Sequence, residues 1–303
     1  MHKEVVQVKI WVLVENSTYK AEILGSHGLS MLIETMYEDN TRFTFLFDTG
    51  NNGEVLEKNV KQLGAPLKNV QAIVLSHGHY DHTGGLIKAL DFIGKRVPII
   101  AHPDAFLRKF VVRPRIRYNG IPFTKNEIQN HGGIIIENKR PLEIAPNVYV
   151  LGEIPRKTEF EETKGFYVVR NDHVEEDLML DDQGVAIKIG DSAIILSGCA
   201  HSGIVNITRY ALEVTKSNDA RLIIGGFHLA GANKNRIART LEEFKNINVE
   251  KVAPMHCSGL WITTELLRKK PSMYLELHAG DSIIIQNSII IQNNNNTMIR
   301  EGR

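Results

Sequence analysis

The sequence has very little cysteine and almost no net charge. Its 303 residues include two cysteines, Cys199 and Cys257, which are too few for a disulfide framework. Thirty-six basic side chains against thirty-five acidic ones leave a formal charge of +1, so no global field draws the chain to nucleic acid or to an anionic membrane. We therefore expect both cysteines to be reduced thiols. We expect neither nucleic acid nor a membrane as a partner, and any binding of anions must depend on local groups of cations.

Long apolar runs and a secretion signal are also missing. No apolar run approaches the roughly 18 residues that span a bilayer, and the opening residues, MHKEVVQVKIWVLVEN, lack the pattern of a secretory signal. We predict a cytoplasmic location. A hydrophobic share of 43% beside 23% charged residues is typical of a globular protein, and the length allows one large domain or two ordinary ones.

The N-terminal third alternates strand-like and helix-like segments. Residues 5–14, 29–37 and 42–47 are rich in β-branched and aromatic residues and predict consecutive antiparallel strands. A capping asparagine and apolar residues at helical spacing predict a helix over 51–64. A short strand follows at 72–76, then a helix over 81–94 and another strand at 97–101.

The last third repeats this alternation and places a histidine after each strand. Helices are predicted over 204–216 and 233–246, between strand-and-loop segments at 192–203, 221–231 and 249–259. The three loops carry His201, His228 and His256. Loops that leave the carboxyl ends of strands converge on one edge of a sheet, so we expect these histidines to lie near one another.

The middle and the end of the chain break the pattern. Residues at about 105–190 mix prolines, charges and short strand-like runs, which predicts an insertion or flap that shapes a pocket. The segment SIIIQN at 282–287 is repeated at 288–293 and followed by asparagines. We assign 1–285 to one domain, and we interpret 286–303 as a low-complexity polar tail without a function.

A dense group of potential metal ligands lies in SHGHYDHTGGL, residues 76–86. Because alternate side chains at a strand end point the same way, His77 and His79 can hold one cation, while Asp81 and His82 face a second. Imidazole nitrogen and carboxylate oxygen are the ligands that zinc and similar cations prefer. Further ligands must come from elsewhere in the chain, and the three strand-end histidines are the candidates.

This arrangement resembles the metallo-β-lactamase superfamily, whose H-x-H-x-D-H signature stands here as HGHYDH. The resemblance covers about residues 5–285 and implies an α+β fold, a four-layer αββα sandwich with the inserted region at about 105–190. It implies two divalent metal ions, zinc in the first place and otherwise iron or manganese. The implied ligands are His77, His79 and His201 for one ion, and Asp81, His82 and His256 for the other.

The strand end FLFDTG also resembles one of the superfamily, which implies that Asp48 orients a metal-ligating histidine by hydrogen bonding. The alternative is that Asp48 caps the next helix. One position departs from the superfamily, which usually has a bridging aspartate where IIGGFHL offers Phe227 and His228. Either the two metals share only water and Asp81, or His228 acts as a ligand or a substrate donor, or one site is weak, or His228 only packs. We read Cys199 and Cys257 as buried thiols, with a minor role near the site as the alternative.

The implied chemistry follows from the same comparison. His79 stands where the oxygen-reducing di-iron branch has glutamate, so redox chemistry is disfavoured. Longer segments, at 152–161 and 181–206, resemble a subgroup assigned as the synthase of 7,8-dihydropterin-6-methyl-4-(β-D-ribofuranosyl)aminobenzene 5'-phosphate, in methanopterin biosynthesis. The resemblance implies an enzyme that transfers a dihydropterin-methyl group from its diphosphate to an aminobenzene ribotide. A metal-dependent hydrolase of phosphoesters or lactones, and a non-catalytic metal- or ligand-binding module, stay open as alternatives.

The candidate catalytic residues are Asp81 and His228. The expected partner is a phosphorylated small molecule, and the sequence carries no signal for an oligomeric state. Tyr80 and His27 can line a pocket beside the ligands, and Arg156 is a candidate for phosphate binding because guanidinium groups match phosphate geometry. Further candidates for phosphate binding are Arg108, Lys109, Arg113, Arg115, Arg117 and Lys157. The alternative is that these cations form a surface exposed to solvent.

Overall fold

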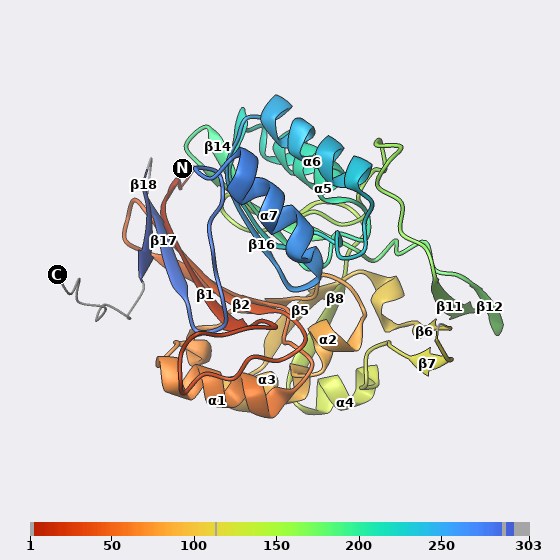
Figure 1. Cartoon of the computed structure of the whole chain (residues 1–303). Coiled ribbons are helices and arrows are strands. Elements are labelled where there is room, and N and C mark those ends of the chain that lie inside the picture. The colour runs from red at the N-terminus through yellow and green to blue at the C-terminus, as the bar shows by residue number, and fades with distance from the viewer. Residues whose placement is uncertain (1–2, 113, 287–288, 294–303) are drawn as a thin grey trace.

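The computed structural model describes residues 3–112, 114–286 and 289–293, which form three sheets (Figure 1). The first sheet runs in the order β18 (Ile289–Asn293), β17 (Ser282–Gln286), β1 (Val5–Val14), β2 (Ser30–Tyr37), β3 (Arg42–Phe47), β4 (Ala72–Val74), β5 (Val97–Ala101) and β8 (Gly133–Glu137). The second runs β16 (Val249–Met255), β15 (Asp219–Gly226), β14 (Ser192–Ser197), β13 (Gly184–Ile189), β10 (Val148–Val150) and β9 (Leu142–Ala145). The small third sheet runs β12 (His173–Glu176), β11 (Phe166–Arg170), β6 (Arg108–Val111) and β7 (Arg117–Tyr118).

The two large sheets pack face to face, and helices cover their outer faces (Figure 1). Along β3, Phe45 and Phe47 point into the layer between the sheets, whereas Leu46 points outward to the helices, as the two-residue period of a strand requires. Helices α1 (Gly53–Leu63), α3 (Leu86–Ile93) and α4 (Lys125–Asn130) pack on the first sheet, and α5 (Ile204–Thr215), α6 (Lys234–Asn246) and α7 (Leu260–Lys269) pack on the second. The predicted αββα sandwich is confirmed.

The parallel strands point their carboxyl ends toward one edge. In the first sheet β3, β4 and β5 are parallel, and in the second β14, β15 and β16 are parallel. The loops that carry His77, His201, His228 and His256 follow β4, β14, β15 and β16 in turn. Both sheets therefore present their histidine loops at the same edge of the sandwich.

The helix predicted over 81–94 is instead two helices, α2 (Tyr80–Thr83) and α3. The break falls at Gly84 and Gly85, where the backbone of residues 49–51 passes close by. A Cβ would lie 2.3 Å from the carbonyl oxygen of Asn51 at the first position and 2.2 Å from that of Thr49 at the second. The close backbone contact needs these glycines, and glycine in turn favours a break in the helix.

The region at about 105–190 is built into the sandwich more fully than a flap would be. Only β6, β7, β11 and β12 form a sheet of their own, whereas β8 joins the first large sheet and β9, β10 and β13 join the second. The run GIIIE of β8 pairs in parallel with β5, because its β-branched residues extend an apolar edge. The inserted part is therefore narrower than predicted.

The interpretation of residues 286–303 as a low-complexity polar tail is wrong for the second SIIIQN copy, which forms a strand. Residues 289–293 form β18, which pairs antiparallel with β17 in the register Ile284↔Ile291. The repeated isoleucines favour a strand, and this strand adds to an open sheet edge. The strand preference of isoleucine outweighs the low complexity of the segment. Residues 287–288 and 294–303 lie outside the described residues. Within the described chain, no helix combines the length and apolarity needed to cross a bilayer.

Candidate metal centre

The loop between β4 and α2 is fixed by two buried carboxylates. Asp48 accepts hydrogen bonds from the backbone N–H and the hydroxyl of Ser76, both at 2.7 Å. Asp181 accepts a bond of 2.8 Å from the backbone N–H of Gly78. Gly78 is required here, because a Cβ would lie 2.1 Å from the carbonyl oxygen of Ala105. The ring nitrogens of His77 and His79 are thereby held 2.9 Å apart, Nε2 to Nδ1.

His201 completes the first group of ligands. The ligand atoms of His77, His79 and His201 lie within 4.8 Å of one another, and all three side chains are buried. Burial lowers the pKa of His79 to about 3 and lowers the pKa values of the other two well below the usual value. The three imidazoles are therefore neutral, which is the form that binds a metal.

Unsatisfied nitrogens support a cation at this group. Among the residues that the structure describes, both ring nitrogens of His201 and Nε2 of His79 are buried without a hydrogen-bond partner. An unpaired buried polar atom costs about 1–3 kcal/mol, and three together call for a missing partner. Imidazole nitrogens accept a divalent cation well, so the residues present fit a bound metal ion.

Asp81, His82 and His256 form the second group. Oδ2 of Asp81 lies 3.3 Å from Nε2 of His256 and 3.9 Å from Nε2 of His82, and the two Nε2 atoms are 3.3 Å apart. Although burial lowers the pKa of His82, the carboxylates of Asp48 and Asp81 raise it to about 9. The group is thus arranged around positive charge, which a metal ion would provide in place of the proton.

The predicted role of Asp48 as an orienting residue agrees with its contacts. Its Oδ2 lies 2.7 Å from Nδ1 of His82 and also accepts the Ser76 hydroxyl, while that hydroxyl lies 2.9 Å from Nδ1 of His77. Asp48 itself is fully buried and adopts a φ of 57°, which is unusual for a residue other than glycine. One carboxylate thus orients a histidine of each group, and it does not cap helix α1, whose N-cap is Asn52.

Replacement of Asp48 by asparagine is expected to weaken metal binding by about 10–100-fold, the usual effect of losing a partner that orients metal ligands. The amide keeps the size of the side chain but presents one acceptor oxygen where the carboxylate presents two. Competition with a chromogenic chelator measures the affinity. An affinity equal to that of the wild type would contradict the orienting role.

Other orienting residues had no distinct signal in the sequence. His256 is held by Asn16, whose Oδ1 lies 3.0 Å from its Nδ1, and by Glu15, which accepts its backbone N–H at 2.9 Å. Asp182 accepts both the backbone N–H and the hydroxyl of Ser202, next to His201, at 2.9 and 2.5 Å. An acidic or amide side chain within two residues of a strand end is the sequence feature that they share.

His228 and Phe166 border the first group. The ring of His228 lies 4.3 Å from that of His201, and its Nδ1 is buried without a partner among the described residues. Phe166, on β11, places its ring 5.0 Å from the rings of both His79 and His201. Phe227 instead packs in the core against Phe244. The small third sheet thus covers one side of the histidines, a contact that the sequence did not predict.

Two of the predicted pocket residues reach the second group. Nε2 of His27 lies 3.3 Å from Oδ2 of Asp81, and its side chain is 56% exposed, so it borders both the ligands and solvent. Tyr80 is half-buried beside it, with the two rings 6.5 Å apart. His27 and Tyr80 therefore stand where a substrate approaching Asp81 would meet them.

The cations predicted for phosphate binding differ in their surroundings. Lys109 is buried and bonded to Asp177 and Asp181 at 2.5 and 2.9 Å, so its assignment to phosphate binding is wrong. The guanidinium group of Arg156 donates to the carbonyl oxygens of Leu178 and Met179. The side chains of Arg108, Arg115, Arg117 and Lys157 are exposed, and Arg113 lies outside the described residues.

The fold and the site define a class of αββα proteins that gather histidines and carboxylates for divalent metal ions at the carboxyl ends of their strands. Residues 25–226 match the metallo-β-lactamase superfamily. The chain belongs to this superfamily and is an enzyme, which sets aside the non-catalytic alternative.

Two relatives and one solved structure extend the comparison. The chain is 34% identical to the 7,8-dihydropterin-6-methyl-4-(β-D-ribofuranosyl)-aminobenzene-5'-phosphate synthase of Methanocaldococcus jannaschii, over 91% of this chain and 96% of that protein. It is also 34% identical to an uncharacterised protein of the same organism, over 88% and 96%. The crystal structure of a metal-dependent hydrolase of the β-lactamase superfamily is 26% identical and superposes with a TM-score of 0.76, covering 92% of this chain and 99% of that one.

Proposed function

We propose that the chain is a dinuclear metal-dependent enzyme that joins a dihydropterin-methyl diphosphate to an aminobenzene ribotide. The observation that carries this proposal is the 34% identity with the methanocaldococcal synthase over 91% of the chain. The two groups of candidate ligands support it. The substrate is accordingly a phosphorylated small molecule. The cytoplasmic location stays a prediction.

The two groups of ligands would hold one metal ion each. Zinc is the first candidate, and iron and manganese accept the same donors. Bound divalent ions supply Lewis acidity to the oxygens of a diphosphate leaving group. The proposed ligands are His77, His79 and His201 for the first ion, and Asp81, His82 and His256 for the second.

The remaining residues have separate roles in this proposal. The nucleophilic atom of the ribotide bonds to the methylene carbon, the carbon–oxygen bond breaks, and diphosphate departs with the electron pair. His228, whose buried Nδ1 has no partner among the described residues, accepts the proton that the nucleophile loses. His27, beside Asp81, donates a hydrogen bond to the departing diphosphate. Phe166 excludes water from the side of His79 and His201, which favours transfer over hydrolysis.

The test is a two-substrate assay of the metal-loaded protein. We expect 7,8-dihydropterin-6-methyl diphosphate and 4-(β-D-ribofuranosyl)aminobenzene 5'-phosphate to give the joined product and free diphosphate in equal amounts. Diphosphate release should depend on the ribotide. A protein that forms no joined product with either order of addition contradicts the transfer.

A metal-dependent hydrolase of phosphoesters or lactones is the second candidate. The similarity to a solved metal-dependent hydrolase, at 26% identity and a TM-score of 0.76, favours it. In this case water is the nucleophile, and the diphosphate substrate alone should yield hydroxymethyl-dihydropterin and diphosphate. Release without the ribotide therefore separates hydrolysis from transfer.

Replacement of Phe166 by alanine gives a further check on the transfer reading. The change opens the side of the site that the aromatic ring covers, so water should compete better with the ribotide. We expect the ratio of hydroxymethyl-dihydropterin to joined product to rise about tenfold, which corresponds to about 1.4 kcal/mol in relative barrier. Chromatography of both products from one reaction measures the ratio, and an unchanged ratio would exclude this role for Phe166.

A further inference from the structure

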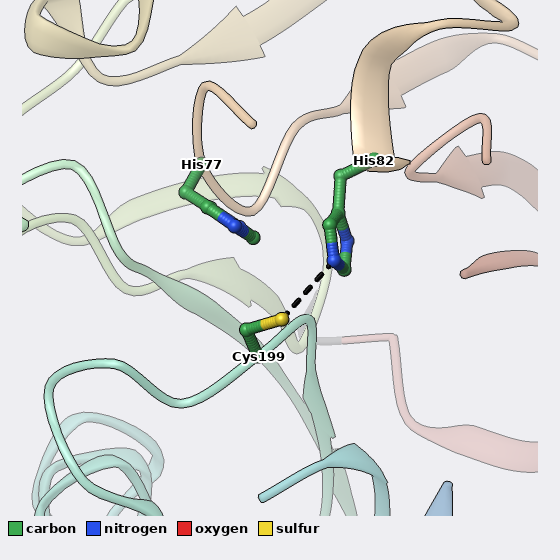
Figure 2. Close-up of side chains that lie close together, drawn as sticks. All are labelled: His77, His82 and Cys199. Carbon is green, nitrogen blue, oxygen red and sulfur yellow. Dashed lines mark hydrogen bonds between the residues drawn. The ribbon is translucent and has the colours of Figure 1, made fainter. Parts of the chain in front are cut away.

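A cysteine lies among the predicted ligands. Cys199 follows β14 in the loop that leads to His201, and its side chain is 4% exposed. Its Sγ lies 3.2 Å from Nε2 of His82. Figure 2 shows the side chains of His77, in the loop before α2, His82, on α2, and Cys199, in the loop after β14, pointing toward one another. Their ligand atoms all lie within 4.8 Å of one another.

The sulfur of Cys199 is near both groups of ligands. It lies within 4.8 Å of ligand atoms of His77 and His201, which belong to the first group. It lies within the same distance of ligand atoms of His82 and His256, which belong to the second. Several sets of three potential donors have ligand atoms that all lie within 4.8 Å of one another, and we call these sets compact groups. Cys199 belongs to three of them, and no other donor in the described part of the chain belongs to as many. Such a position is the one that a ligand shared by two metal ions must have.

The local backbone and the neighbouring strand favour this position. Ala200, between Cys199 and His201, has a φ of 57°, a left-handed conformation that is uncommon outside glycine and is often retained at functional sites. The turn brings the donors on both sides of Ala200 into one group. Meanwhile Phe227, where the superfamily usually has a bridging aspartate, is fully buried in the core and offers no ligand atom.

We propose that Cys199 is a seventh metal ligand and that its thiolate bridges the two metal positions in place of the missing aspartate. This inference rests on the dinuclear site of the proposed function. On metal binding the thiol would lose its one proton to solvent, the resulting thiolate would serve both metal ions, and no electron is transferred. A thiolate in the site favours zinc or iron over manganese, because soft sulfur ligands select those metals.

Cys257 provides a matched control in the same site. Its sulfur also lies within 4.8 Å of ligand atoms of Cys199 and His256. However, it accepts the backbone N–H of His228 at 3.3 Å and contacts the carbonyl oxygen of Cys199 at 3.5 Å, so it is engaged by backbone groups. It belongs to one compact group only. Replacement of Cys257 by serine should therefore leave the metal–sulfur bond in place.

The test uses the full-length protein, freed of metal, kept reduced and loaded with cobalt(II). We expect the wild type and Cys257→Ser to show a sulfur-to-cobalt charge-transfer band in the near ultraviolet, and Cys199→Ser to lack it. The proposal is overturned if the wild type binds two cobalt ions without this band, or if the band is lost in Cys257→Ser and kept in Cys199→Ser.

A second measurement needs no variant. X-ray absorption at the zinc edge of the zinc-loaded wild type should contain a sulfur shell at about 2.3 Å beside nitrogen and oxygen at about 2.0–2.1 Å. A spectrum with nitrogen and oxygen alone contradicts the inference. Metal analysis of the same sample shows whether the assignment of Cys199 as a ligand fails alone or the dinuclear site fails with it. Two ions without sulfur refute only the ligand assignment, whereas a protein that binds no metal refutes the dinuclear site as well.

Discussion

Replacement of Asp81 by alanine is expected to abolish turnover and to remove about one of the two proposed metal ions per chain. Oδ2 of Asp81 lies 3.3 Å from nitrogens of both His27 and His256, and it is the only carboxylate oxygen in the second group. Its loss leaves two imidazoles and no carboxylate in this group. We expect turnover to fall by at least about a thousandfold, or about 4 kcal/mol.

The control for Asp81→Ala is Asp91→Ala. Asp91 also pairs with a histidine, with Oδ1 at 2.6 Å from Nδ1 of His131, but the two side chains are 50% and 41% exposed. Exposed pairs of this kind contribute about 0–1 kcal/mol, so metal content and turnover should stay at wild-type values. Elemental analysis and the two-substrate assay on both variants measure the outcome. A fully active Asp81→Ala protein with two bound metals would contradict the assignment of the second group.

Replacement of Lys109 by methionine is expected to destabilise the protein by about 3–5 kcal/mol. Its ammonium group is buried between the carboxylates of Asp177 and Asp181. In the variant these two buried carboxylates lose their positive partner, and an unpaired buried charge is unfavourable. Asp181 also accepts the backbone N–H of Gly78 in the metal-binding loop. The change should therefore weaken both the small third sheet and the loop of His77 and His79.

Lys125→Met is the matched control for this change. Lys125 forms an ion pair of 2.5 Å with Glu137, but both side chains are between one third and one half exposed. An exposed pair contributes about 0–1 kcal/mol. Denaturant unfolding of the two variants, both measured without metal, gives the difference in free energy of unfolding. Equal losses in the two proteins would show that the buried cluster does not stabilise the fold.

The sequence predicted that the candidate ligands would lie close together because they follow strands. The H-x-H-x-D-H segment and the histidines after β14 and β16 each occupy the carboxyl end of a strand, a position that can be read from apolar patterning. The role of Asp48 was predicted from the resemblance of FLFDTG to a strand end of the superfamily. Where the pattern is local, as in β1 to β3, the predicted bounds differ from the observed ones by at most one residue.

The errors concern contacts that depend on the tertiary structure. Lys109 stood in a run of cations that is typical of a solvated surface, and only packing reveals the two aspartates that enclose it. Asn16 and Asp182 orient His256 and the loop of His201 from distant segments, so no local spacing marks them. The strand β18 was missed because its pairing with β17 depends on an open sheet edge.

The most direct test of the account is anomalous X-ray scattering from crystals of the metal-loaded wild-type protein. We predict two peaks, one among the ring nitrogens of His77, His79 and His201, and one among the side chains of Asp81, His82 and His256. A single peak, a peak outside these groups, or no peak after loading with zinc, iron and manganese would contradict the central claim.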